Sequence, residues 1–247
     1  MRGILAGIGL LTLSSVTAAQ PPGKWPPDSL VNVKVFARTT PVNQVVAQMR
    51  NITSYLGVRC HFCHVGEERM PLERYDFASD EKRMKLVARQ MMLMVQEINR
   101  RVDTLPGGST SLEVTCETCH RGVTRPMPLP ALLVDVVQES GADSAVRAYR
   151  ALRSRYYGRD AYDFGEESLT IAAGRLGRSQ KYAEALALVS LNEEFFPRSA
   201  GSAVSRGNIL LLRGDTTGAA DAYREAIRRD STSNEARQRL RAIGRQP

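Results

Sequence analysis

The sequence is poor in aromatic residues, cysteine and histidine. Its 247 residues include one Trp, four Cys and three His, and aromatic residues make up 6% of the chain. No Gly-rich phosphate-binding loop is present, because Gly107-Gly108 lacks the Lys that such a loop requires. No flavin or nicotinamide fingerprint occurs, and no apolar run beyond the first residues is long enough to cross a bilayer. These absences argue against nucleotide-dependent chemistry and against a protein with several membrane spans.

The overall composition is that of a globular protein with an excess of positive charge. Apolar residues make up 43% and charged residues 24%, and Lys plus Arg outnumber Asp plus Glu by 34 to 26, a formal net charge of +8. The length predicts one or two domains. A basic surface favours acidic partners or membrane surfaces. The Arg residues are scattered rather than clustered, so we do not expect nucleic-acid binding.

The four cysteines lie in two C-x-x-C-H motifs, Cys60-His61-Phe62-Cys63-His64 and Cys116-Glu117-Thr118-Cys119-His120. This motif is the attachment signature of a c-type haem. Two thiols three residues apart add to the two vinyl groups of one porphyrin, and the histidine that follows supplies the proximal imidazole to the iron. Two such motifs predict two covalently attached haems. They also engage two of the three histidines, which excludes a Ser/His/Asp catalytic set of the usual form.

Other interpretations of the cysteines remain open. Two C-x-x-C pairs are also typical of a four-cysteine zinc site, although the gap between the pairs is long and zinc does not explain a histidine after each pair. Two disulfides are a weaker alternative. His61, inside the first motif, is either a solvent-facing residue, which we favour, or a ligand to a neighbouring haem.

The first 19 residues resemble a secretory signal peptide. A positive start, Met1-Arg2, precedes an apolar run from Ile4 to Leu13 and small-residue cleavage patterns around Val16 to Ala19. Export would place the chain in an oxidising compartment, where bacterial c-type haem is attached. We therefore expect a periplasmic protein. An uncleaved N-terminal membrane anchor is the alternative.

The region around the motifs predicts a repeated helix–turn–motif unit. After a short strand at 31–36, a helix is expected from Thr39-Thr40-Pro41 to about Gly57, and a second from Ser79-Asp80-Glu81 to Arg100-Arg101. Each helix carries methionines that could complete the coordination of an iron, since methionine is a usual partner of histidine in cytochromes c. In the first helix the candidate is Met49. In the second, three methionines compete: Met91, Met92 and Met94.

The segment from about residue 30 to 128 resembles the cytochrome c subunit of photosynthetic reaction centres. The matching runs include loops as well as motifs: Met49-Arg50, Leu56 to Cys60, Cys63 to Gly66, Tyr75 to Asp80, Met94 to Asn99, Val114 to Cys116, and Cys119 to Gly122. The resemblance implies that Met49 and Met94 are the distal ligands. It also implies that each motif opens a short helix beside the methionine helix. Members of that family in reaction centres carry four haems in two pairs, whereas this chain has one pair, so a role docked on a reaction centre does not follow from the resemblance.

The remainder of the chain predicts helical repeats. A Pro-rich stretch, residues 126–130, marks a change to an Ala-, Arg- and Leu-rich sequence with a period of 34 residues, the tetratricopeptide period. The clearest repeats are 166–199 and 200–233, in which Ala173 corresponds to Gly207 and Ala185 to Ala219. A helix pair at 132–140 and 143–157 precedes them, and a capping helix at 234–243 follows.

The sequence thus predicts an all-α protein with three parts: a signal peptide (1–19), a dihaem c-type cytochrome domain (20–130) and an α-solenoid of tetratricopeptide-like repeats (131–247). The expected function is electron transfer, not enzyme catalysis. Single electrons would pass between periplasmic or membrane-bound redox proteins, a reaction-centre-type electron donor being one form of that role, and the repeats would dock a protein partner or act as a scaffold. The alternative is a peroxidase-like haem enzyme or sensor with one open distal site.

Overall fold

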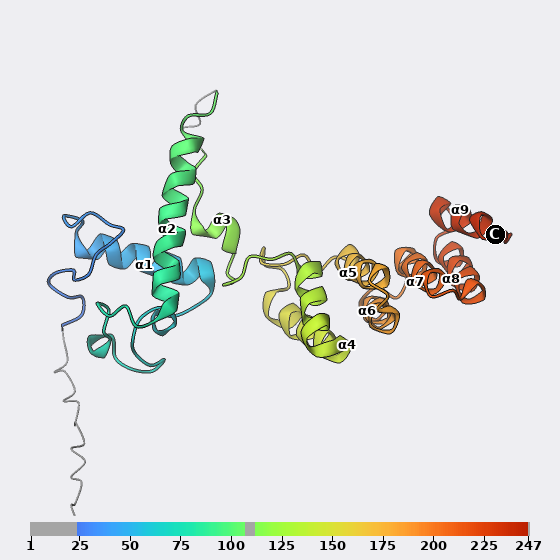
Figure 1. Ribbon diagram of the computed structural model, residues 1–247, viewed down its shortest axis with the longest axis horizontal. Coiled ribbons are helices and arrows are strands. Elements are labelled where there is room, and N and C mark those ends of the chain that lie inside the picture. Colours follow the sequence, from blue (N-terminus) through green and yellow to red (C-terminus); the bar gives the residue numbers. More distant parts are fainter. Residues whose placement is uncertain (1–23, 107–111, 247) are drawn as a thin grey trace, which may run out of the picture. The chain divides into compact units, whose positions relative to one another are not determined.

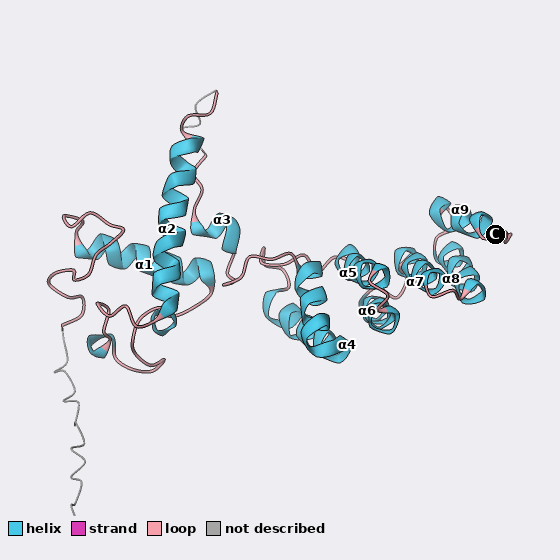
Figure 2. Cartoon of the chain, in the orientation of Figure 1, coloured by secondary structure: helices cyan, strands magenta, loops and turns pink. Residues whose placement is uncertain are grey.

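The computed structural model describes residues 24–106 and 112–246, and these residues are organised by helices alone (Figure 2). The expected signal peptide lies outside the described residues. The predicted strand at 31–36 is wrong: these residues form bends, and the one β-type pairing in the described part is an isolated bridge between Val65 and Asp76. Residues 31–36, polar and apolar alike, line a cavity and do not pair with a neighbouring strand.

The chain divides into two compact units between Cys116 and Glu117. This division falls earlier than the boundary expected from the Pro-rich stretch. Residue 130 lies inside a helix, α4 (Leu129–Tyr156), because Pro128 ends the preceding segment and Pro130 occupies the first turn, where its missing N–H costs nothing. Each unit is described separately below.

The N-terminal unit contains two long helices, α1 (Val42–Leu56) and α2 (Arg83–Val102), with two short 3₁₀ turns, Cys60–Phe62 and Leu72–Arg74, between them (Figure 1). Helix α1 follows Pro41 and ends at Gly57, whose φ of 65° is left-handed and whose N–H donates to the carbonyl of Ser54. The predicted end at Gly57 is therefore confirmed. The first haem motif begins three residues later, in the first 3₁₀ turn.

Helix α2 begins later than expected. The segment Ser79–Lys82 was predicted to open the helix, but it has no regular secondary structure. Just before it, the Asp76 carboxylate accepts from the N–H groups of Ala78 and Ser79 at 2.9 and 2.8 Å. Asp76 thus satisfies these N–H groups in a local turn, the alternative to a helix that Asp side chains offer. The last turn of α2 carries Arg100 and Arg101, as predicted from the helix dipole.

The C-terminal unit contains a series of helices: α4, α5 (Glu166–Arg178), α6 (Tyr182–Phe195), α7 (Ala200–Leu212), α8 (Thr216–Arg229) and α9 (Asn234–Ala242). The predicted pair at 132–140 and 143–157 corresponds to α4, which is broken at Gly141 where φ is 79°. Helices α5 and α7 begin at 166 and 200, and α6 and α8 at 182 and 216, so both helices recur after 34 residues. The period read from the sequence is thus the period of the helix pairs.

Small residues let the helices of each pair approach closely. Ala173, Ala185 and Ala219 are fully buried, and Gly207 packs on the ring of Tyr223. Larger side chains fill the rest of the core, namely Leu129, Leu133, Tyr149, Leu169, Leu176, Leu188 and Val189 in its first part and Tyr223 and Leu240 in its second. The C-terminal unit therefore has a hydrophobic interior of its own, made of two clusters of buried side chains.

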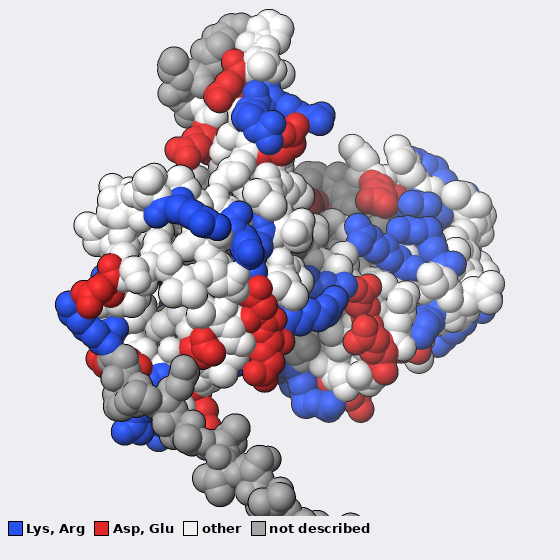
Figure 3. Space-filling view, turned by 60° about the vertical axis from the view of Figure 1, so that its left-hand side comes forward, with Lys and Arg blue, Asp and Glu red and all other residues white. Residues whose placement is uncertain are grey.

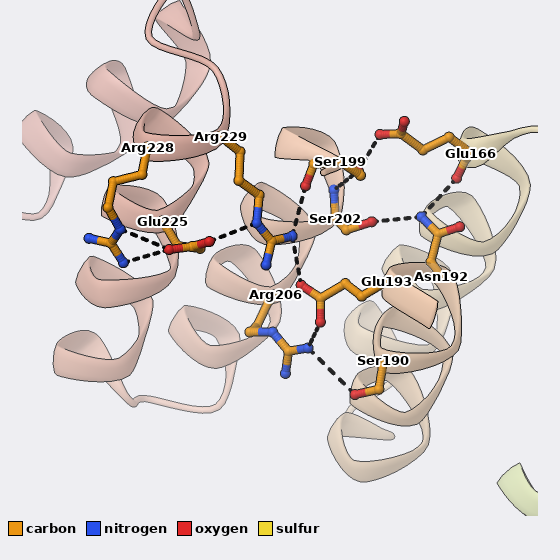
Figure 4. A network of polar contacts seen from close by, with 10 residues as sticks. All are labelled: Glu166, Ser190, Asn192, Glu193, Ser199, Ser202, Arg206, Glu225, Arg228 and Arg229. Atoms are coloured by element: carbon orange, nitrogen blue, oxygen red, sulfur yellow. Dashed lines mark hydrogen bonds and ion pairs between the residues drawn. The ribbon is translucent and has the colours of Figure 1, made fainter. Parts of the chain in front are cut away.

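A polar network crosses from α6 to α7 and α8 (Figure 4). The Glu193 carboxylate pairs with Arg206 and, at 3.1 Å, with Arg229, which also pairs with Glu225 at 2.8 Å. The buried Asn192 amide donates to the Glu166 carbonyl at 3.1 Å and to the Ser202 hydroxyl at 2.7 Å. These contacts join one helix pair to the next. A network of several charges contributes more to holding two helix pairs in position than isolated surface ion pairs do.

Charge is distributed in small groups. On the face of the N-terminal unit in Figure 3, Lys, Arg, Asp and Glu side chains are separated by wide areas without charge. Among the described residues, no helix has the length and apolar character needed to cross a membrane. The scattered pattern agrees with the distribution of Arg along the sequence.

Candidate haem site

A cavity of about 630 Å³ lies within the N-terminal unit, in the size range of small-molecule and cofactor sites. Apolar side chains dominate its wall: Val33, Val35 and Phe36 from the segment before α1, Val45, Val46, Ile52 and Leu56 from α1, and Trp25, Tyr75 and Phe77 from the loops. Cys60, Cys63 and His64 of the first motif also line it. The structure therefore places one complete set of predicted attachment residues on one apolar cavity.

The His64 imidazole is held in the neutral form that a metal ligand requires. The pKa of His64 is lowered to about 4, first by burial and second by the charge of nearby Lys85. The Nδ1 atom is buried without a hydrogen-bond partner of normal geometry, although the Phe77 carbonyl is near enough to oppose part of the pKa shift. The ring packs edge-on against Phe77, with centroids 4.9 Å apart. A buried, neutral and unpaired imidazole on a cavity wall fits an iron ligand.

Two methionines line the same cavity, Met49 from α1 and Met92 from α2. Met49 is the distal ligand that the resemblance implies for the first haem. Met92 belongs to the face of α2 formed by Lys85, Ala88 and Arg89, three and four residues apart, which all line the cavity as well. Sequence reasoning grouped Met92 with the candidates for the second haem, and did not predict that it would lie on the first cavity.

The other candidates on α2 lie on a different face. Val87, Met91 and Met94 follow each other at helical spacing and are exposed, with 36, 44 and 49% of their surface accessible. Neither Met91 nor Met94 lines the first cavity. Helix α2 thus presents Met92 to one side and Met91 with Met94 to another.

The second motif forms the short helix α3 (Cys116–His120). The Nδ1 atom of His120 lies 2.8 Å from the carbonyl oxygen of Val123. A carbonyl can only accept, so Nδ1 carries the proton and Nε2 keeps its lone pair. This is the arrangement by which a backbone carbonyl orients a metal-binding histidine.

Two aromatic residues near the first motif have a greater part in the site than the sequence indicated. Trp25, the one tryptophan of the chain, lines the cavity and stacks on Phe77 with centroids 4.6 Å apart. His61 is half-buried, and its Nδ1 atom is buried without a partner, so the side chain faces solvent only in part. Lys82 donates to the His61 carbonyl and links this turn to the start of α2.

A zinc site receives no support from the described residues. Nowhere in the ranges 24–106 and 112–246 do three or more His, Cys, Asp or Glu side chains come close enough to hold a metal ion, and the four cysteines form no disulfide. The apolar cavity and the neutral imidazole instead fit a haem held by two thioether bonds and one histidine.

A helical unit that sets a C-x-x-C-H motif and a helix methionine on one apolar cavity is typical of c-type cytochromes. The family model of the photosynthetic reaction centre cytochrome C subunit matches residues 11–155, more than half of the chain, and the chain belongs to this family. Its members are c-type haem proteins of electron transfer. The match extends past the second motif and through nearly all of α4.

The chain is also similar to the photosynthetic reaction center cytochrome c subunit of Rubrivivax gelatinosus, with 33% identity over 114 residues. The alignment covers 45% of this chain and 27% of that relative. The chain therefore spans about a quarter of the length of the curated relative that it matches.

Proposed function

We propose that this chain is an exported dihaem c-type cytochrome that carries single electrons between periplasmic or membrane-bound redox proteins. One haem is attached at each motif, and each iron is bound by a histidine and a methionine. The proposed attachment residues and ligands are Cys60, Cys63, His64 and Met49 for the first haem, and Cys116, Cys119, His120 and Met94 for the second. Each iron cycles between ferrous and ferric states, so no substrate needs to bind it.

The observation that carries this proposal is the shared cavity of the first site. Met49, Cys60, Cys63 and His64 come from two separate segments of the chain and line the same apolar space. An electron carrier needs this kind of site, because an iron with two protein ligands in an apolar pocket exchanges electrons without taking up water or substrate. Family membership supports the same role.

The face of α2 that carries Met91 and Met94 supports the choice of distal ligand for the second haem. Met92 lines the first cavity, so we assign the second haem to one of the two methionines on the other face. The resemblance to the family selects Met94. Met94→Ala should lower the potential of one haem only, and Met91→Ala, a change at a similarly exposed position, should leave both potentials in place. The reverse result would move the ligand to Met91.

The C-terminal helix pairs are proposed to be tetratricopeptide-type repeats that dock a partner or act as a scaffold. Their support is the 34-residue recurrence of helix starts together with buried small residues at corresponding positions. Removing residues 131–247 cuts through α4. A deletion from residue 157 onward keeps α4 whole but removes α5 and α6, which share a hydrophobic cluster with Leu133 and Tyr149 of α4. Haem attachment and reduction are therefore measured first in this variant, and where both are retained its association with a redox partner should be weaker.

The first experiment is a pyridine haemochrome assay with an optical redox titration, on protein matured by the c-type haem machinery. The proposal predicts two haems per chain, both low-spin, with potentials typical of methionine ligation. A high-spin haem that binds small ligands would indicate a haem enzyme or sensor instead. Absence of covalent haem would refute the proposal.

A further inference from the structure

A lysine side chain is buried in the wall of the first cavity. Lys85, on α2, exposes 8% of its surface and is the one buried charged residue among the described residues of the N-terminal unit, 24–106 and 112–116. Lysine is seldom buried in this way unless its charge is compensated. The groups around the Lys85 ammonium therefore show how its charge is compensated.

All the hydrogen-bonding capacity of Lys85 is used inside the protein. Its Nζ atom donates to the carbonyls of Phe77, Ala78 and Ser79 at 2.8, 3.0 and 2.7 Å, and lies 3.1 Å from the Asp80 carboxylate. An ammonium group has three N–H donors, and four acceptors surround them here. No donor is left to bind an anionic group of a cofactor, whereas the positive charge remains.

A second cation shares the same carboxylate. The Arg89 guanidinium, one helical turn further along α2, pairs with Asp80 at 2.9 Å and donates to the Asn32 carbonyl at 2.9 Å. Both cations line the cavity, and their side chains are only 10% and 13% exposed. The single Asp80 carboxylate faces two cations, so the cluster of Asp80, Lys85 and Arg89 has a net positive charge. Because the two cationic side chains are mostly buried, water screens this charge poorly.

This positive charge is close to His64. Phe77 links the two groups, because its carbonyl accepts from Lys85 and its ring packs against the imidazole. The positive charge of Lys85 therefore acts close to the His64 imidazole, which would bind the first iron.

We propose that Lys85, positioned by Asp80 together with Arg89, is a fixed positive charge on the proximal side of the first haem that raises its reduction potential. Reduction adds one electron, supplied by the redox partner, and lowers the charge at the iron by one unit. A nearby cation disfavours the ferric state more than the ferrous state, and so shifts the equilibrium toward reduction. This inference rests on the proposed function, since it requires a haem at the first motif.

The test compares two substitutions with opposite expected signs. In Lys85→Gln the charge is lost while polar hydrogens remain for the carbonyls, and the potential of the first haem should fall by about 59 mV, a tenfold change in a one-electron equilibrium constant. In Asp80→Asn the counter-charge is lost and the cations stay, so the potential should rise. Lys85→Arg should restore most of the original value. Arg100→Gln, at an exposed position on the same helix, should change nothing.

The opposite signs separate electrostatics from structural damage. A loosened cavity admits water and lowers the potential in both variants, so a fall in Asp80→Asn as well as in Lys85→Gln would overturn the inference. An unchanged potential in Lys85→Gln with both haems attached would also overturn it, and would leave the proposed function intact. Absence of haem from the unmodified protein would overturn both. If Lys85→Gln fails to fold, the sign of the shift in Asp80→Asn decides.

Discussion

Gly207 on α7 lies against the ring of Tyr223 on α8 so closely that a Cβ atom on Gly207 would be 2.4 Å from Tyr223 Cε1. The ring has no room to withdraw, because Tyr223 is fully buried and its hydroxyl donates to Asn208 at 2.8 Å. The sequence pattern placed Gly207 at the same repeat position as Ala173. The structure explains why the second repeat needs the smaller residue: Val189, at the position of Tyr223 in the first repeat, leaves space for a methyl group.

Gly207→Ala should destabilise the C-terminal unit by about 1–3 kcal/mol, the usual cost of forcing an extra carbon into a packed core. The free energy of unfolding from urea titration checks this value. Gly174→Ala is the matched control, because Gly174 is also inside a helix and a Cβ there meets only the flexible end of Arg178, at 3.6 Å. That change should stabilise by about 0.5–1 kcal/mol. Equal effects of the two changes would contradict the close packing described here.

Met49→Ala should lower the potential of one haem and remove the spectroscopic signature of methionine ligation from it, because the thioether of Met49 is its proposed distal ligand. The optical titration and the ligand-field spectrum of the ferric protein provide the measurement. Met92→Ala is the control, since Met92 lines the same cavity and loses a similar volume. If Met92→Ala and not Met49→Ala removes the signature, the distal ligand comes from α2.

The sequence predicted those features of the fold that depend on local patterns. The end of α1 at Gly57, the cations in the last turn of α2 and the 34-residue period of the helix pairs all follow from spacing and residue type. The start of α2 and the strand at 31–36 were wrong for different reasons. Asp76 caps a local turn before α2, and residues 31–36 line the cavity without pairing with a strand.

The residues that would attach the haem were predictable from the sequence, whereas the residues of the cavity wall around them were not. Cys60, Cys63 and His64 were identified because a fixed spacing defines their chemistry. Lys85 was not, since a lysine in an amphipathic helix is expected to be exposed, and the three carbonyls that surround it have no signature in the sequence. The separation of Met92 from Met91 and Met94 likewise depends on the rotation of α2 about its axis, which spacing alone does not fix.

The N-terminal unit should depend on attached haem for its stability. Among its described residues, 24–106 and 112–116, Val45 is the only buried apolar residue, and many of the others line the cavity. The double variant Cys60→Ser/Cys63→Ser should therefore lose hydrogen-exchange protection in α1 and α2, since a small unit without a filled core is marginal.

The C-terminal unit provides the internal reference for that experiment. Its helices pack around two clusters of buried apolar side chains, so α5 to α8 should keep their protection in the same sample. Protection of α1 and α2 that survives loss of the first haem would mean that the N-terminal unit is stable through its polypeptide contacts alone.

Acid should weaken α8 through its N-cap residue. The pKa of Asp215 is lowered, first because its carboxylate accepts a hydrogen bond from the Gly218 N–H at 2.8 Å, and second because Arg213 donates to it at 3.1 Å. A carboxyl group whose pKa is lower in the folded state stabilises the fold fully above its unfolded pKa of about 3.9, and this contribution disappears as the pH falls through the folded value. Asp215→Asn keeps the cap but has no carboxyl to titrate, so its loss of stability between neutral pH and acid should be smaller than that of the unmodified protein. Urea unfolding across this pH range measures the difference, and parallel pH profiles for the two proteins would show that the cap makes no contribution to the acid sensitivity.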